Sequence, residues 1–185
     1  MYKGARTAFF KNSDPHYCGQ INPIKLGKLI CSRSPTNSSR LLQQVRIYTG
    51  RPDAAKQPKA YAAHIKQCNA WEKLGAKVIS RILRYPPAWP TSKPEQKGVD
   101  VALAIDFVAL AIDNEYDIGV IASTDTDLKP AIEYVNKKCG TQCQAEVLAW
   151  KSSIAKTRLY MPSVWCHHLD INDYNSLADL TDYNA

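Results

Sequence analysis

The chain has 185 residues and a formal net charge of +7, and 45% of its residues are hydrophobic. This balance is that of an ordinary globular domain with a sizeable core, and the sequence contains no internal repeat or low-complexity tract. No apolar run approaches the roughly 20 residues that a membrane span needs, and the first residues lack the apolar region of a signal peptide. We therefore expect a single-domain cytoplasmic protein without a membrane partner.

The first half of the chain predicts alternating strands and helices. Strands are expected over residues 6–10, 42–48 and 77–83, and helices over residues 23–31 and 58–74. The second of these helices carries apolar residues at helical spacing and ends before Gly75. Residues 84–95 hold four prolines and Trp89, which predicts a loop because proline donates no backbone hydrogen bond. The basic and aromatic character of this loop makes it a candidate for contacting a substrate.

The second half continues the alternation. Residues 99–113 form a nearly all-apolar helix that we expect to pack deeply, and residues 118–122 form an apolar run typical of a central parallel strand. Further helices are expected over 129–138 and 152–159, and further strands over 145–149 and 163–166. The alternation predicts an α/β fold with a mostly parallel central sheet of about five strands and helices on both faces.

Charge is unevenly distributed along the chain. Residues 161–185 contain four Asp and neither Lys nor Arg, so the preceding 160 residues carry a net charge of +11. A basic body favours a polyanionic partner such as nucleic acid, and the alternative is charge that serves only solubility. We expect a domain over residues 1–160 and an acidic extension over 161–185 that packs on it. The apolar side chains expected to hold the extension are Trp165, Leu169, Tyr174 and Leu177.

Two carboxylates, Asp125 and Asp127, follow the apolar run at 118–122. Ligands of open α/β sheets bind outside the carboxyl ends of the strands, so these side chains lie where a ligand is expected. Neighbouring carboxylates repel each other, and Mg²⁺ or Mn²⁺, which prefer oxygen ligands, would relieve that repulsion. The alternative is that one of the two only caps the following helix, a role in which Asp is favoured.

A third carboxylate, Asp100, lies in the first turn of the apolar helix that starts at Val99. There it interacts favourably with the helix dipole. A buried charge also needs a partner, and a metal ion shared with Asp125 would supply one. Asp106 lies about 240° further round the same helix at 100° per residue, so we assign it a structural role.

Six cysteines are scattered along the chain, and without a secretory signal we expect them to be reduced. Zinc ligands could come from Cys139, Cys143, Cys166, His167 and His168. Their spacing matches no standard zinc finger, so a zinc site is the less favoured interpretation.

Two stretches, KGVDVALAIDFVALA at 97–111 and YDIGVIASTDTDLKPAIEYV at 116–135, resemble the signature half of NYN domains, a family of PIN-like, LabA-like metal-dependent nucleases. Upstream, VRIYTGRP and WEKLGAKV are similar to the family's second strand and the approach to its third. The resemblance implies that Asp100, Asp125 and Asp127 are catalytic and hold Mg²⁺ or Mn²⁺. It also implies substrate contacts for Ser123 and for Thr124, which stands where the family usually has Gly.

The sequence departs from this family at its N-terminus. NYN domains typically end their first strand with D-G-x-N, whose aspartate is a metal ligand. Aligning residues 7–10 with that strand puts Asn12 at the position of the aspartate. Asn ligates through its carbonyl oxygen but brings no charge, and Asp14 is the possible substitute. Both are therefore candidate metal ligands, and the departure bears on catalysis more than on the fold.

The leading interpretation is a metal-dependent endoribonuclease. Its phosphate-binding residues would be Lys11, Arg51, Arg84 and Lys97. The alternative is a catalytically impaired NYN-type domain that binds nucleic acid or regulates another protein. A third interpretation is a metal-dependent phosphatase or nucleotidyl enzyme for small molecules. The sequence leaves open whether the RNA is single-stranded or structured, and whether the chain forms a homodimer or binds a regulatory protein.

Overall fold

The computed structural model describes residues 1–35, 39–152, 159 and 161–185. Its elements divide between two compact units. Unit 1 consists of Met1–Leu26 and Ala104–Leu180, and unit 2 consists of Gly27–Leu103 and Thr181–Ala185. Helices α2 (Pro23–Ser32) and α4 (Val99–Ile112) each begin in one unit and end in the other. Within the described residues, no helix is long and apolar enough to cross a membrane.

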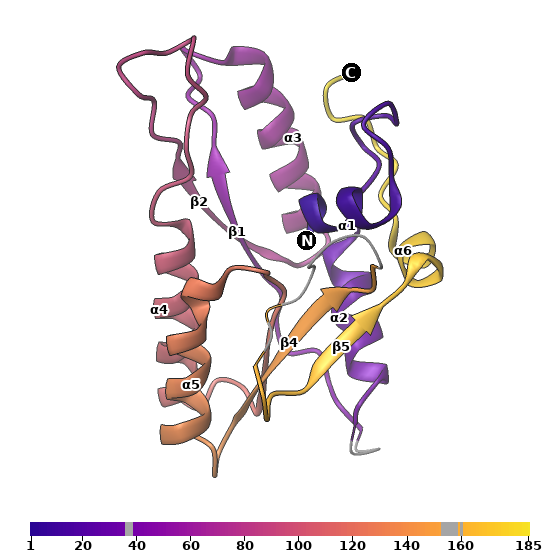
Figure 1. The fold of residues 1–185 in the computed structure, drawn as a ribbon, viewed down its shortest axis with the longest axis vertical. Coiled ribbons are helices and arrows are strands. Elements are labelled where there is room, and N and C mark those ends of the chain that lie inside the picture. The colour runs from indigo at the N-terminus through magenta and orange to yellow at the C-terminus, as the bar shows by residue number, and fades with distance from the viewer. Residues whose placement is uncertain (36–38, 153–158, 160) are drawn as a thin grey trace. The chain divides into compact units, whose positions relative to one another are not determined.

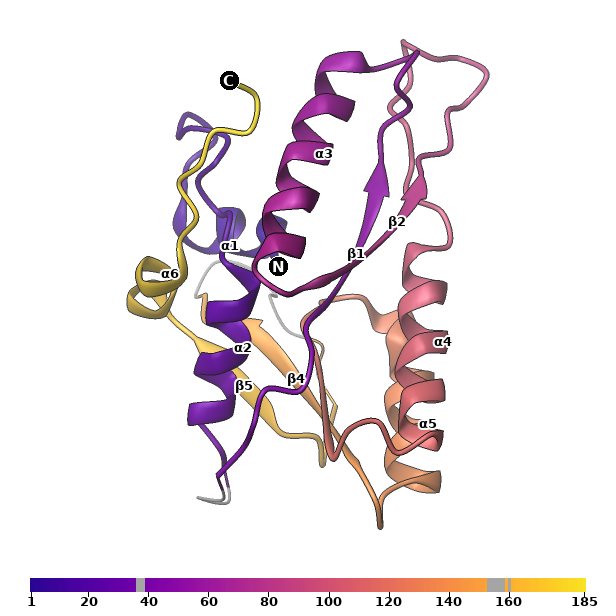
Figure 2. The ribbon, with the colours of Figure 1, turned by 180° about the vertical axis from the view of Figure 1, so that it is seen from behind.

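Unit 2 is built around two parallel strands, β1 (Arg46–Arg51) and β2 (Lys77–Ile82). Helix α3 (Pro58–Lys73) connects them and lies alongside the pair (Figure 2). It starts at Pro58, where the missing N–H costs no helical hydrogen bond. It ends before Gly75, which has a φ of +97° and donates its N–H to the Glu72 carbonyl at 2.9 Å.

Unit 1 contains a parallel sheet in the order β3-β4-β5. Its strands are β3 (Ile118–Ile121), β4 (Gln144–Trp150) and β5 (Cys166–Leu169). Its other elements are α1 (Tyr2–Phe9), the 3₁₀ helix η1 (Thr126–Leu128), α5 (Lys129–Lys138) and α6 (Ile171–Leu177). Strands β4 and β5 run side by side in the same direction (Figure 1). Residues 145–150 of β4 are all buried, so both faces of this central strand are covered.

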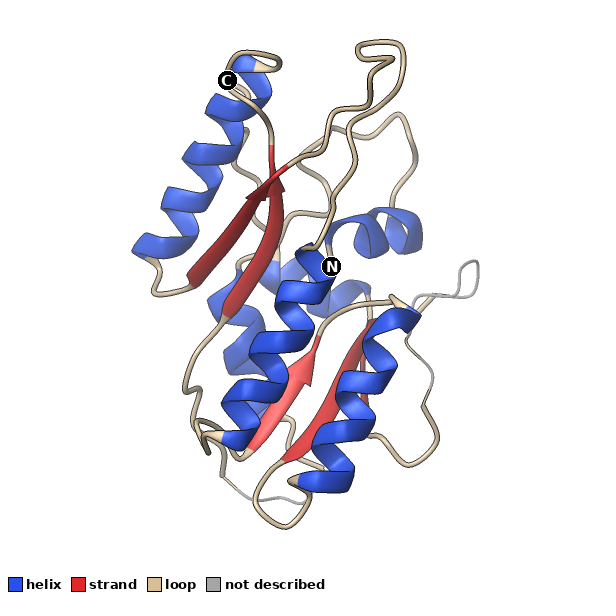
Figure 3. Ribbon diagram, turned by 90° about the vertical axis from the view of Figure 1, so that its left-hand side faces the viewer, coloured by secondary structure: helices blue, strands red, loops and turns tan. Residues whose placement is uncertain are grey.

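The fold is mixed α/β, and each strand pair among the described residues is parallel, as predicted. A single sheet of five strands is not confirmed, because the described strands form one sheet of two strands and one of three (Figure 3). The strand expected over 163–166 begins only at Cys166. The helix expected over 152–159 falls mostly on residues 153–158, which lie outside the described part of the chain.

The strand predicted over residues 6–10 is wrong, because most of this segment belongs to helix α1. The helix buries Ala5 completely and packs Phe9 edge-on against Trp150, with ring centroids 5.6 Å apart. The Trp150 indole N–H also donates to the Met1 carbonyl at 3.1 Å. Aromatic residues favour strands on local propensity alone, but packing against a residue almost 150 positions away decides the conformation here.

Helix α4 is packed deeply on one face only, which corrects the expectation that the whole helix is buried. Phe107 and Ala111 are buried, whereas Val101, Ile105 and Ile112 are each more than half exposed. The buried face fits closely against β3. A Cβ atom on Gly119 would lie 2.5 Å from Cε2 of Phe107, so the absence of a side chain at this position lets the ring approach the strand.

Residues 161–180 supply the third strand and the last helix of unit 1. Leu169, Tyr174 and Leu177 are buried, whereas Trp165 is 53% exposed. Helix α6 starts with a capping box, in which the Asp170 carboxylate accepts from the backbone N–H of Asp173 and the Asp173 carboxylate accepts from that of Asp170. Residues 181–185 group with unit 2.

Candidate functional site

The carboxylates of Asp125 and Asp127 lie in the turn between β3 and η1. The Ser123 hydroxyl oxygen accepts from the Asp125 N–H at 3.1 Å, and Asp125 Oδ1 accepts from the Asp127 N–H at 3.0 Å. Asp125 is therefore the N-cap of η1, the role considered as the alternative to metal binding. The two roles are compatible, because the capping bond uses only part of the acceptor capacity of a carboxylate. Asp125 is half-buried and Asp127 is exposed.

This turn offers the oxygen ligands that a hard cation such as Mg²⁺ requires. Two carboxylates placed two residues apart supply the oxygen ligands that Mg²⁺ and Mn²⁺ prefer. The backbone at Thr124 is unstrained, because Asn114 and Ser163 are the only described non-glycine residues with positive φ. Across the described residues, no three His, Cys, Asp or Glu side chains gather into a group that could hold a metal ion. The cysteines and histidines considered as zinc ligands, all of them described, therefore form no such group either.

Asp100 belongs to unit 2, whereas Asp125 and Asp127 belong to unit 1. It lies in the first turn of α4, two residues after Gly98, which has a φ of +72°. A Cβ atom on Gly98 would lie 3.5 Å from Nε of Arg81, so the start of α4 lies beside β2. The structure thus places the first turn of α4, which carries Asp100, beside β2 at Arg81.

Asn12 and Asp14 lie in a turn after helix α1 instead of at the end of a strand. Asp14 Oδ2 accepts from the Lys11 N–H at 2.7 Å, and the Arg6 guanidinium donates to the Asp14 carbonyl at 3.1 Å. Lys11 and Asn12 are exposed. The Asp14 carboxylate therefore closes its own turn. The predicted strand-end position of Asn12 is wrong, because the residues before it are helical.

Three of the predicted basic residues lie at the carboxyl edge of the β1–β2 sheet. Arg51 ends β1, and its carbonyl accepts from the Leu83 N–H at 2.9 Å, immediately before Arg84. Lys97 follows Gln96, whose Cγ would lie 2.8 Å from a Cβ atom on Gly50. Glycine at position 50 therefore permits the close approach of residues 96–97 to β1. The fourth predicted residue, Lys11, belongs to unit 1.

The charge of Arg51 also acts on helix α3. Burial lowers the pKa of His64, and the Arg51 guanidinium lowers it further, so this histidine is neutral at pH 7. Burial raises the pKa of Cys68 to about 11, with Glu72 raising it and Arg51 lowering it. The Cys68 sulfur lies 3.3 Å from Nε2 of His64. These two groups therefore add no charge beside Arg51 at neutral pH.

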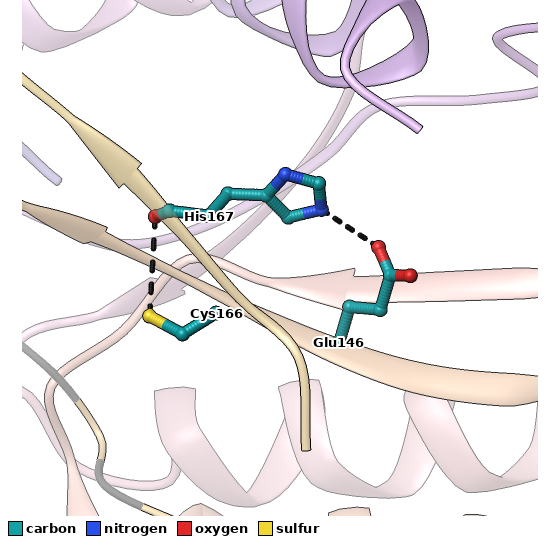
Figure 4. Close-up of polar contacts among 3 residues, drawn as sticks. All are labelled: Glu146, Cys166 and His167. Carbon is teal, nitrogen blue, oxygen red and sulfur yellow. Dashed lines mark hydrogen bonds and ion pairs between the residues drawn. The ribbon is translucent and has the colours of Figure 1, made fainter. Parts of the chain in front are cut away.

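A buried pair that the sequence analysis missed joins β4 to β5 (Figure 4). Nε2 of His167 lies 2.7 Å from Oε2 of Glu146, and both side chains are less than 5% exposed. The available signal was a Glu inside an otherwise apolar strand, but its partner depends on the β4–β5 register, which places Leu148 opposite His167. Each group satisfies the other, which is the usual condition for burying polar side chains.

Comparison with known families gives one result that covers most of the chain. The NYN domain family model matches residues 14–158. The match includes Asp100, Asp125 and Asp127, and it leaves Asn12 outside. No curated protein and no solved structure matches the chain. The matched region contains strands β1 to β4 and the acidic turn after β3, and it extends over more than three quarters of the residues. The chain therefore belongs to the NYN domain family.

Proposed function

We propose that this chain is a metal-dependent ribonuclease in which Asp125 and Asp127 hold Mg²⁺ or Mn²⁺ against a phosphodiester, and that Asp100 is a further acidic residue of the reaction. The observation that carries the proposal is the turn after β3, where a strand of the family match ends in two carboxylates. Asp100 is assigned from its K-G-V-D motif. Asn12 and Asp14 are left out of the ligand set, because Asn12 precedes the match and Asp14 closes its own turn.

Each protein group has a defined task in this proposal. The Ser123 hydroxyl holds the backbone of Asp125, and Asp125 in turn holds the backbone of Asp127, which fixes the spacing of the two carboxylates. A bound divalent ion would lower the pKa of a water molecule and neutralise charge on the scissile phosphate. Arg51, Arg84 and Lys97, at the carboxyl edge of the β1–β2 sheet, would bind phosphates of the RNA.

The test is a cleavage assay on a mixed single-stranded RNA with and without Mn²⁺, comparing wild type with Asp125→Asn. Asn is as good an N-cap as Asp, so this variant should keep the η1 turn and the fold. Since it removes a charged ligand, we expect cleavage to fall at least about 100-fold. Asp113→Asn is the matched control, because Asp113 is an exposed carboxylate outside the proposed set. Cleavage that survives Asp125→Asn unchanged would overturn the proposal.

The second candidate is an NYN domain that binds RNA without cutting it. The segment before the match favours it, because residues 2–9 form a helix instead of the strand expected to carry the family's first aspartate, and the Asp14 carboxylate accepts from the Lys11 N–H. Under this alternative, wild type shifts the RNA in a binding assay but leaves it intact in Mg²⁺ and in Mn²⁺. Metal-dependent cleavage that Asp125→Asn abolishes would exclude it.

A further inference from the structure

The loop at residues 84–95 follows the carboxyl end of β2 (Figure 2). It carries an aromatic pair, Tyr85 and Trp89. Its base is closed by two reciprocal backbone hydrogen bonds between Arg84 and Glu95, each 2.9 Å long. Within the loop, the Trp89 N–H donates to the Pro86 carbonyl at 3.0 Å. Four prolines restrict the remaining backbone freedom. The predicted loop is thus a closed, internally bonded structure.

Tyr85 is fixed by the segment that follows β1. Its hydroxyl donates to Oε1 of Gln57 at 2.8 Å and accepts from the Asp53 N–H at 2.9 Å. The Lys56 ammonium lies 4.6 Å from the centroid of the ring, within the range of a cation–π contact. Trp89 packs against this ring with centroids 5.0 Å apart and planes at 87°. A fixed tyrosine therefore orients the tryptophan.

Trp89 remains partly exposed. A ring perpendicular to the indole covers at most one of its two faces, so Tyr85 does not cover both faces of Trp89. Residues 84–97 carry three basic side chains and one acidic side chain, and Lys56, Arg84 and Lys93 are exposed. Surfaces that bind single-stranded nucleic acid combine aromatic rings with basic side chains, as this loop does.

We propose that Trp89 stacks on an unpaired base of single-stranded nucleic acid, with the adjoining phosphates against Lys56, Arg84 and Lys93. The proposal rests on the proposed function and deepens it, because it specifies a strand with accessible bases as the substrate. Tyr85 is a positioning residue that holds the indole. A duplex keeps its bases stacked inside, so Trp89 contributes to binding single strands and not to binding duplexes.

The test is fluorescence anisotropy with a labelled 12-nucleotide RNA and an abasic oligonucleotide of the same length and charge. Divalent ions are omitted so that the probe stays intact. We expect Trp89→Ala to weaken binding of the base-bearing RNA about ten-fold, because one base–aromatic stack is lost. Binding of the abasic strand should not change. Trp89→Phe, which keeps an aromatic face, should recover most of the affinity.

Trp165→Ala is the matched control, because Trp165 is also exposed but belongs to unit 1. It should leave both affinities unchanged. The inference is overturned if Trp89→Ala binds the base-bearing RNA like wild type, as a protein-binding role for this loop predicts. It is also overturned if both oligonucleotides lose affinity equally. If wild type binds neither strand, the proposed function itself fails. Thermal melts of all variants verify that the fold is intact.

Discussion

At the residue scale, the pair formed by Glu146 and His167 has a predictable effect on stability. Both side chains are buried and lie 2.7 Å apart, so removing one leaves the other without this partner in a low-dielectric interior. We expect Glu146→Ala to lower the free energy of unfolding by about 3 kcal/mol, measured by urea titration. His168→Ala changes an exposed neighbour and should cost less than about 0.5 kcal/mol. Equal losses in the two variants would contradict a specific role for the pair.

Residue by residue, the candidate site was only partly predictable. Asp125 and Asp127 were placed correctly after a strand, and the N-cap role of Asp125 was foreseen as an alternative, because both follow from the local order of strand, turn and helix. Asn12 was misplaced, since its assignment depended on a strand that does not form. The partner of Glu146 was not predictable, because the β4–β5 register is a long-range property.

At the element scale, helix α1 depends on an aromatic cluster more than on its own sequence. Phe9 lies 5.6 Å from Trp150 and 6.1 Å from Tyr174, measured between ring centroids. We expect Phe9→Ala to destabilise the protein by about 2 kcal/mol, less than for a fully buried phenylalanine because Phe9 is half-buried. Thr7→Ala, on the exposed side of the same helix, should shift the thermal midpoint much less. Similar melting of the two variants would contradict the docking of α1.

The other elements show when a local pattern suffices. Helix α3 was predicted within one residue at each end, because Pro58 and Gly75 mark its start and stop. Strand β3 was also recognised from a local pattern, because its residues form a continuous apolar run. Helix α4 was also located well, but its exposed face was not foreseen. An all-apolar helix has no periodicity from which its orientation could be read.

At the scale of the whole molecule, the basic charge should make RNA binding sensitive to salt. Residues 1–160 carry a net charge of +11, and neutralising phosphates releases counterions. If about five phosphates of a single strand are neutralised, raising the salt from about 50 to about 200 mM should weaken binding about 100-fold. Trp89→Ala should keep the slope of the salt dependence, because an indole neutralises no phosphate. Affinity that stays constant over this range would contradict electrostatic binding.

Unit 1 takes its first and last segments from opposite ends of the chain, and this has a consequence during synthesis on the ribosome. The Gly19 N–H donates to the Tyr174 hydroxyl across 155 positions, and the Met1 carbonyl accepts from Trp150 across 149. At about 5–20 residues per second, α1 emerges roughly 7–30 s before these partners. An eight-residue helix is marginal alone in water. The newly made α1 therefore leaves Phe9 and Phe10 exposed until Trp150 and Tyr174 have been synthesised, and such an apolar segment is one that a nascent-chain chaperone would bind.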